Sequence, residues 1–295
     1  MTSPDLKSFI QQHTHFITDL EEIIDNILEK GHVFLYDTSA ISSHEKAFYH
    51  HKATLFLEHV KDVPILITDV IAKEMRLTED VEGRYLAYLS MFKTVLYAEE
   101  RDLYTLLKVE YGASQAKQRF LIASEKSFSC IQPLRESIRK ARNTFQIAEK
   151  IIFDDYETFF ANCNHKNHGE MSLLWTACIL NQILSKQMIT FVGVDQDLYT
   201  YVEQCYFLIG NGKRGTNTSH VIYMMSNEVL LQSYYVQQGD TEKFIELVPI
   251  YRDEHRKVMY HHRNSGILHL VRQTEKVTNA EFIEKITSDQ IQMIY

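Results

Sequence analysis

The sequence contains little proline and glycine, with only 4 Pro and 10 Gly among its 295 residues. Average proteins contain about 5% Pro and about 7% Gly, so both residues fall well below their usual frequency. This shortage argues against long flexible linkers and against an all-β fold, which would need many tight turns. We therefore expect helices to dominate the structure.

Cysteine is also scarce, and long apolar runs are missing. The four cysteines form no CxxC pair and no dense pattern, which favours reduced thiols over a disulfide framework. No segment approaches the roughly 18 consecutive apolar residues of a membrane-spanning helix, and the first residues lack a signal-peptide pattern. We therefore expect a cytoplasmic protein with no membrane partner.

Basic residues are outnumbered by acidic ones, 31 to 39, which gives a formal net charge of -8. This balance argues against a protein that coats nucleic acid through a broad basic surface. It still allows a local basic track beside an acidic centre. The hydrophobic content of 45% is enough to bury a sizeable core in one large domain or two modest ones.

Three short apolar runs predict buried strands. They are "VFLYD" at 33–37, "VPILIT" at 63–68 and "MITFVGVD" at 188–195, with a fourth candidate in "CYFLIG" at 205–210. Strands that are apolar along their whole length and alternate with helices predict a parallel sheet covered on both faces. The expected fold class is therefore α/β, as a three-layer α/β/α arrangement around four or five strands.

Helical periodicity suggests how the rest of the chain is organised. Residues 1–30 are expected to form an N-terminal helix, because apolar residues recur every three or four positions and Gly31 can end the helix. Residues 31–210 are expected to form the α/β domain, with a helical insertion at about 80–165. The loop "GNGKRGTNTS" then introduces a predicted C-terminal helical extension at 211–295.

Four acids are expected at one edge of the predicted sheet. Asp37 ends the first strand, Asp195 ends the third, Glu74 follows the second strand on a helix, and Glu170 opens the helix before the third. The carboxyl ends of parallel strands meet at one edge, where ligands bind in α/β folds. Each acid near a helix start could also simply complement the helix dipole.

Several carboxylates at one edge would repel one another. Two carboxylates ~4 Å apart cost about 4 kcal/mol at an effective dielectric constant of 20, so a cluster must take up protons or bind a cation. Oxygen ligands without Cys or His favour Mg²⁺ or Mn²⁺ over zinc. Such an ion can polarise a phosphoryl oxygen and activate a water molecule.

The segments "FLYDTSAI", "PILITDVIAKEM", "GEMSLLWTAC" and "ITFVGVDQDL" occur in an order that resembles the PIN-domain nucleases, which cut RNA with a metal held by acids. The resemblance covers roughly residues 31–210. It implies a metal-dependent endoribonuclease whose catalytic residues are Asp37, Glu74, Glu170 and Asp195. Asp197 is a further metal ligand in this interpretation, and Thr38 and Ser39 support the site.

The sequence departs from the family pattern at several points. Gly193 stands where the family usually has Thr or Ser, and Leu198 replaces a Phe. About 95 residues separate Glu74 from Glu170, more than in small family members. Gly193 and the acidity of the chain favour an alternative function, a non-catalytic PIN-like scaffold that binds RNA or protein.

Two further patterns offer weaker alternatives. "DQDLYT" superficially resembles the DxDxT loop of haloacid dehalogenase-like phosphatases, but Thr200 lies one position too late. Cys163, His165 and His168 could form half of a zinc site, although no second ligand pair has suitable spacing.

RNA is the expected partner, with single-stranded DNA as the alternative. Lys213 and Arg214, in the Gly-rich loop, are the predicted phosphate contacts, and His168 is a further candidate for binding nucleic acid. The aromatic-rich pattern at 84–111 could bury the surface of a second copy or of a regulatory protein.

Overall fold

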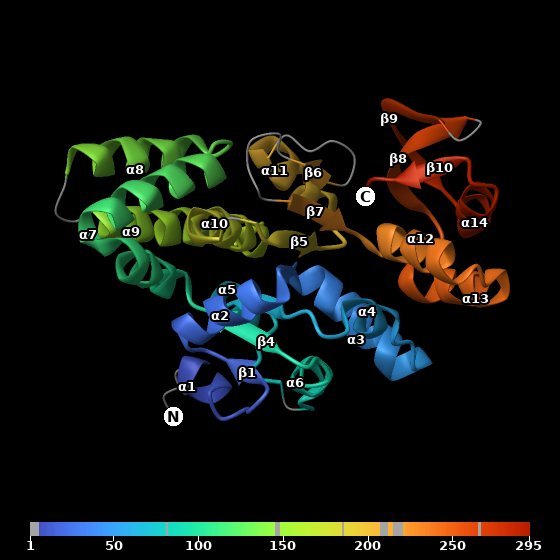
Figure 1. Ribbon diagram of the computed structural model, residues 1–295, viewed down its shortest axis with the longest axis horizontal. Coiled ribbons are helices and arrows are strands. Elements are labelled where there is room, and N and C mark those ends of the chain that lie inside the picture. Colours follow the sequence, from blue (N-terminus) through green and yellow to red (C-terminus); the bar gives the residue numbers. More distant parts are fainter. Residues whose placement is uncertain are drawn as a thin grey trace.

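A central sheet runs through the middle of the molecule (Figure 1). The computed structural model describes residues 6–80, 82–144, 148–184, 186–206, 212–214, 221–264 and 267–295. Within these ranges the sheet has seven strands, in the spatial order β1 (Phe16–Ile17), β4 (Val95–Ala98), β3 (Ile65–Thr68), β2 (His32–Tyr36), β5 (Met188–Val192), β7 (Val221–Met225) and β6 (Gly212–Arg214). Only the β6–β7 pair is antiparallel in this described sheet. Helices flank the sheet, which confirms the predicted three-layer α/β/α class.

The apolar runs correctly predicted β2, β3 and β5, but the sheet is larger than expected. β4 was missed because "VLYA" lies inside a longer stretch with helical spacing, although all four of its residues are buried. β4 pairs in parallel with both β1 and β3. The central position of β2, between β3 and β5, brings the ends of those three strands together.

The predicted single N-terminal helix is wrong. The segment instead forms α1 (Leu6–Ile10), the edge strand β1 and α2 (Leu20–Lys30). Asp19 starts the second helix by accepting hydrogen bonds from the amides of Glu21 and Glu22. Gly31 ends it with a φ of 67°, as expected for a glycine C-cap.

The region at 80–165, expected to be a helical insertion, forms α6 (Arg84–Leu89), β4, α7 (Glu100–Ser127), α8 (Gln132–Asn143) and α9 (Ala148–Asn162). Its helices enclose an aromatic cluster around Trp175, which lies on α10 (His168–Ile183). The ring of Tyr156 lies 4.8 Å from that of Trp175 between centroids, and the indole nitrogen donates to Ser124 Oγ at 3.0 Å. This buried cluster anchors the insertion to α10 and so to the sheet.

The C-terminal extension is not purely helical, which corrects the prediction for 211–295. It contains α12 (Asn227–Gln238), α13 (Thr241–Tyr251) and α14 (Asn279–Thr287), but β6 and β7 join the main sheet. A second, antiparallel sheet in the described ranges consists of β8 (Arg256–Asn264), β9 (Ile267–Val277) and β10 (Ile291–Met293). The many His, Arg and Lys residues of "RKVMYHHRN" conceal its strand pattern, although Val258, Met259, Tyr260 and His261 are all buried.

The predicted strand at 205–210 is also wrong where it can be checked. Cys205 and Tyr206 are the last residues of α11 (Gln196–Tyr206), and 207–211 lie outside the described residues. The four cysteines are free thiols. In the part of the chain covered by the structure, no helix has the length and apolar character needed to cross a bilayer.

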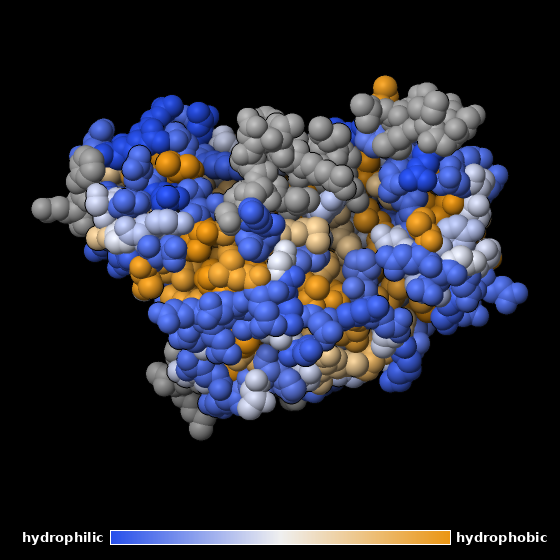
Figure 2. All heavy atoms as spheres, viewed as in Figure 1, coloured by the Kyte–Doolittle hydropathy of each residue, from blue (hydrophilic) through white to orange (hydrophobic). Residues whose placement is uncertain are grey.

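One face of the molecule carries a band of apolar side chains. Figure 2 shows apolar side chains gathered in a band across the middle of this face, between the insertion helices and α2, with hydrophilic residues on either side. Among large apolar side chains, Val109 on α7 is 64% exposed and Leu28 on α2 is 48% exposed.

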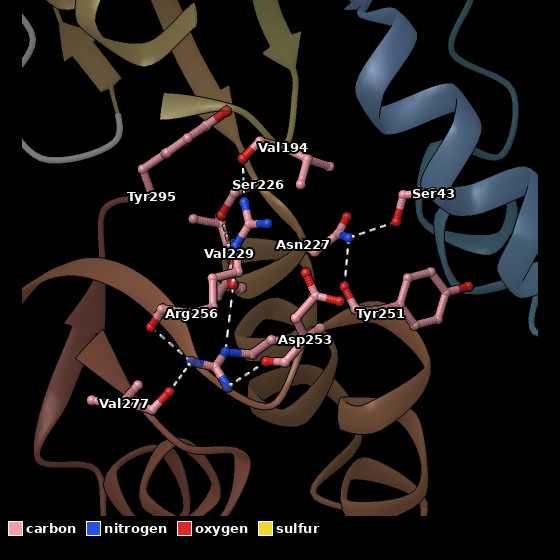
Figure 3. Close-up of polar contacts among 12 residues, drawn as sticks. Ser43, Val194, Ser226, Asn227, Val229, Tyr251, Asp253, Arg256, Val277 and Tyr295 are labelled. Carbon is pink, nitrogen blue, oxygen red and sulfur yellow. Dashed lines mark hydrogen bonds and ion pairs between the residues drawn. The ribbon is translucent and has the colours of Figure 1, made fainter. Parts of the chain in front are cut away.

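A buried polar network connects the sheet domain to the C-terminal helices. His44 lies on α3 (Thr38–His51), where its Nδ1 is 2.6 Å from the Tyr36 hydroxyl and its Nε2 is 2.8 Å from Asn227 Oδ1. Asn227 Nδ2 in turn donates to Ser43 Oγ at 3.0 Å and to the Tyr251 carbonyl at 2.6 Å (Figure 3). Burial lowers the pKa of His44 to about 4.

His44 is therefore expected to make the protein sensitive to acid. Its pKa in the folded state lies below the unfolded value of 6.5, so the unfolded chain binds more protons and stability falls as the pH drops from about 6.5 towards 4. The loss from this residue is up to about 3 kcal/mol. Urea denaturation of wild type and His44→Gln across this pH range measures it. If both proteins show the same pH slope, His44 is not the group responsible.

Candidate metal centre

Asp37 occupies the junction between β2 and α3. Its amide donates to the Val192 carbonyl at 2.9 Å, which ties the end of β2 to the end of β5. Its carboxylate caps α3 by accepting from the Ser39 amide at 3.0 Å and from Ser39 Oγ at 2.5 Å. Only 3% of Asp37 is exposed, so the chain buries a carboxylate at this strand end.

Glu74 reaches the same edge from the last residue of α5 (Asp69–Glu74), the helix after β3. Its Oε2 accepts from Thr38 Oγ1 at 2.6 Å, and its Oε1 accepts from the Gly169 amide at 3.0 Å. A Cβ atom at position 169 would lie 2.6 Å from Glu74 Oε2. Position 169 is therefore glycine because Glu74 approaches the backbone so closely.

Glu170 and Asp195 complete a group of four acids. Burial, together with the charges of Asp37, Glu74 and Asp195, raises the pKa of Glu170 to about 8. Burial also raises the pKa of Asp37 to about 6, against the hydrogen bonds from Ser39, while Glu74 and Asp195 act in the same direction as burial. Burial raises the pKa of Glu74 as well. The structure thus brings the four predicted acids close enough to affect one another.

Asp197 lies to one side of this group. It is exposed in the first turn of α11, and its Oδ2 accepts from Asn167 Nδ2 at 3.2 Å. Apart from burial, the charges that chiefly raise the pKa of Glu170 belong to Asp37, Glu74 and Asp195 and not to Asp197. The sequence predicted Asp197 as a further metal ligand, but the structure does not place it with the four acids.

The chemistry of these donors suits a hard divalent cation such as Mg²⁺ or Mn²⁺, since they are oxygens that repel one another. In the described ranges, however, no group of three or more His, Cys, Asp or Glu side chains is already arranged to hold a metal ion. Several carboxylate oxygens instead accept hydrogen bonds from Ser39, Thr38 and Gly169. Comparison with protein-family models, curated proteins and solved structures gave no match. The function of this edge must therefore be inferred from its own residues.

The loop that carries Asp195 is held from several sides. The Val194 amide donates to Ser39 Oγ at 3.1 Å, so one serine contacts both Asp37 and this loop. The Tyr295 hydroxyl donates to the Asp195 carbonyl at 2.7 Å. Arg256 donates to the Val194 carbonyl, as Figure 3 shows. Two of these contacts come from the C-terminal extension.

Packing explains why position 193 is glycine. A Cβ atom there would lie 2.5 Å from Leu198 Cδ2 and 3.3 Å from the Tyr295 hydroxyl oxygen. Thr or Ser would therefore clash with Leu198, and the hydroxyl beside that position belongs to Tyr295 instead. Sequence reasoning missed Tyr295, because no local pattern reports a contact across about a hundred residues.

Arg256 is itself fixed by a buried ion pair. Its Nε lies 2.8 Å from Glu228 Oε1, and the Nε of Arg252 lies 3.5 Å from the same oxygen. The side chains of Glu228 and Arg252 are completely buried. Arg252 also donates to the Val277 carbonyl at 2.7 Å (Figure 3). This cluster joins α12 to the second sheet and to the Asp195 loop.

Three residues were predicted to contact nucleic acid, and the structure describes the side chain of only one of them, His168. His168 is the first residue of α10, with 7% of its surface exposed, and it stacks on Phe160 with ring centroids 4.3 Å apart. Burial lowers its pKa to about 4, so it carries no charge for phosphate at neutral pH. The backbone of Lys213 and Arg214 forms β6, but their side chains lie outside what the structure describes.

The raised pKa of Glu170 predicts that ionisation of this side chain lowers the free energy of unfolding. Its pKa of about 8 in the folded state exceeds the unfolded value of 4.5, so stability is lost as the pH rises through this interval. Glu170→Gln should therefore be more stable than wild type by about 2 to 4 kcal/mol at pH 8, and nearly equal to it at pH 4.5. Denaturant unfolding at both pH values measures the difference. A variant less stable than wild type at pH 8 would contradict this account.

Proposed function

We propose that this chain is a metal-dependent endoribonuclease with a PIN-like core. The observation that carries the proposal is the meeting of Asp37, Glu74, Glu170 and Asp195 near the carboxyl ends of neighbouring parallel strands. There, burial and the charges of the other three acids raise the pKa of Glu170. Such mutual repulsion stores free energy that a bound cation would release. The same edge is where ligands bind in open α/β sheets.

In this proposal Asp37, Glu74 and Asp195 hold Mg²⁺ or Mn²⁺, which would polarise the scissile phosphate and lower the pKa of an attacking water. Glu170 orients a second ion or the water, and its raised pKa allows it to exchange a proton near neutral pH. Ser39 keeps Asp37 and the Asp195 loop at a constant separation, while Thr38 orients Glu74. The four free thiols suit a reducing location such as the cytoplasm.

The second candidate is a PIN-like scaffold that binds RNA or protein without cutting. It is favoured by the hydrogen bonds that the carboxylates of Asp37 and Glu74 already accept from Ser39, Thr38 and Gly169. The two candidates differ in whether the acids bind an ion. Calorimetric titration with Mn²⁺ should show a site that is lost in Asp37→Asn if the chain is a nuclease.

Cleavage itself is tested with a mixed RNA pool. Full-length protein with Mn²⁺ should produce internal cuts, which sequencing of the new ends would map, and EDTA should abolish them. A parallel pool of single-stranded DNA decides between the two substrates. Cutting that persists in EDTA would refute the metal-dependent mechanism.

A further inference from the structure

A pocket of about 380 Å³ lies beside Glu74, one of the four acids. Its apolar and aromatic part comes from Val70 and His168, and Lys73, Arg76 and Glu157 supply charges around it. Glu74 lines the pocket and also belongs to the candidate metal centre. A molecule in this pocket would therefore lie next to the bound phosphate of a substrate. Its volume falls in the range of about 300–1,000 Å³ that is typical of ligand sites.

His168 has a buried polar atom without a partner. Its Nδ1 lies 3.3 Å from His165 Nδ1, but its Nε2 is buried and has no hydrogen-bond partner among the residues that the structure covers. The residue is more than nine-tenths buried, and Phe160 covers one face of its ring. An unpaired buried polar atom costs about 1–3 kcal/mol, which a ligand could recover by hydrogen bonding.

The charges around the pocket offer complementary contacts. Lys73 is paired with Asp69 at 2.6 Å but remains 60% exposed, and the exposed Arg76 has no ion pair within the described ranges. These cations suit a phosphate group, whereas the exposed carboxylate of Glu157 accepts hydrogen bonds from amino or imino groups. The exposed imidazole of His165, which also lines the pocket, provides a surface against which a planar base can pack.

We propose that this pocket binds one ribonucleotide of the substrate, adjacent to the phosphodiester held at the acids. The proposal rests on the proposed nuclease function and adds the place where a neighbouring nucleotide is recognised. The base packs on the exposed His165 ring, and its edge hydrogen-bonds to His168 Nε2 and Glu157. Its phosphate contacts Arg76 and Lys73.

Binding can be measured apart from cleavage. Full-length protein in EDTA is titrated with the four ribonucleoside 5′-monophosphates, followed by calorimetry. Arg76→Gln removes the cation with little change in size, and His168→Phe keeps the stacking on Phe160 but loses Nε2. Both variants should bind the monophosphates at least fivefold more weakly, while their affinity for Mn²⁺ changes less than twofold. Arg135→Gln, an exposed arginine on α8, is the matched control and should bind like wild type.

Two results would overturn the proposal: equal affinity of wild type and Arg76→Gln for every monophosphate, or competition by inorganic phosphate as strong as that of the nucleotides. Thermal melting of His168→Phe shows whether weaker binding reflects unfolding, and Arg76→Gln tests the pocket independently. Nucleotide binding that depends on Arg76, without RNA cleavage in Mn²⁺, would refute the nuclease and retain the pocket. Cleavage with unchanged nucleotide binding in both variants would refute the pocket alone.

Discussion

If the chain is the proposed nuclease, Asp37→Asn is expected to lower Mn²⁺-dependent RNA cleavage by at least about 100-fold, because a neutral amide replaces the carboxylate proposed to hold the ion. Asn still accepts a hydrogen bond from the Ser39 amide and is an equally good N-cap, so α3 should remain intact. Because burial raises the pKa of Asp37 to about 6, removing its charge should not reduce the free energy of unfolding at pH 7.5. Loss of activity would then be separate from loss of folding.

Initial rates on a fluorescently labelled RNA, together with thermal melting, test this prediction. Asp25→Asn is the matched control, because Asp25 is an exposed acid on α2. It should cleave at the wild-type rate. Full activity in Asp37→Asn would refute the assignment of Asp37 as a metal ligand, and a large drop in its melting temperature would contradict the argument on folding.

Glu228→Gln is expected to destabilise the protein by about 3 to 5 kcal/mol, the usual cost of breaking a buried ion pair. Glu228 is the carboxylate shared by Arg252 and Arg256, and its side chain has no exposed surface. Gln has nearly the same size, so the loss would come from the guanidinium groups that remain buried without a counter-charge. Denaturant unfolding at pH 7.5 measures the change.

The surface pair of Glu246 with Lys243 provides the comparison. Glu246 is 65% exposed on α13 and lies 3.0 Å from the lysine nitrogen. Glu246→Gln should change stability by less than about 1 kcal/mol, since water screens exposed pairs. Equal effects of the two substitutions would show that the Glu228 cluster is not specially important for joining the C-terminal extension to the core.

Much of the acidic edge could be predicted from local sequence. Buried strands are short and apolar, and an acid soon after one marks the strand's carboxyl end. Asp37 directly follows β2, and Asp195 comes three residues after the end of β5. In a parallel sheet all such ends lie on one side, so acids distant in the chain could be placed together before their contacts were known. Glu74 and Glu170 followed from helices attached to the same strands.

Other features could not be predicted from local patterns. β1 has only two residues, and β4 lies within a helical periodicity, so each is defined by its pairing partner. The strands β8 and β9 carry many charged residues, which in sequence resemble a solvated helix face. Their strand conformation follows from pairing with each other and, for β8, with β10. Asp195 and Asp197 were both predicted as metal ligands from the same short segment. The side chain of Asp197 instead accepts a hydrogen bond from Asn167.

The sequence alone determined the α/β class, the three strands around the site and the four acids, because these depend on apolar runs and on residues at strand ends. Only the tertiary structure decided what holds the acids in place. Tyr295 and Arg256 reach the Asp195 loop from a part of the chain about a hundred and about sixty residues away. Gly193 is needed because Leu198 and Tyr295 occupy the space beside it. Such contacts arise from packing between distant segments, which no local periodicity records.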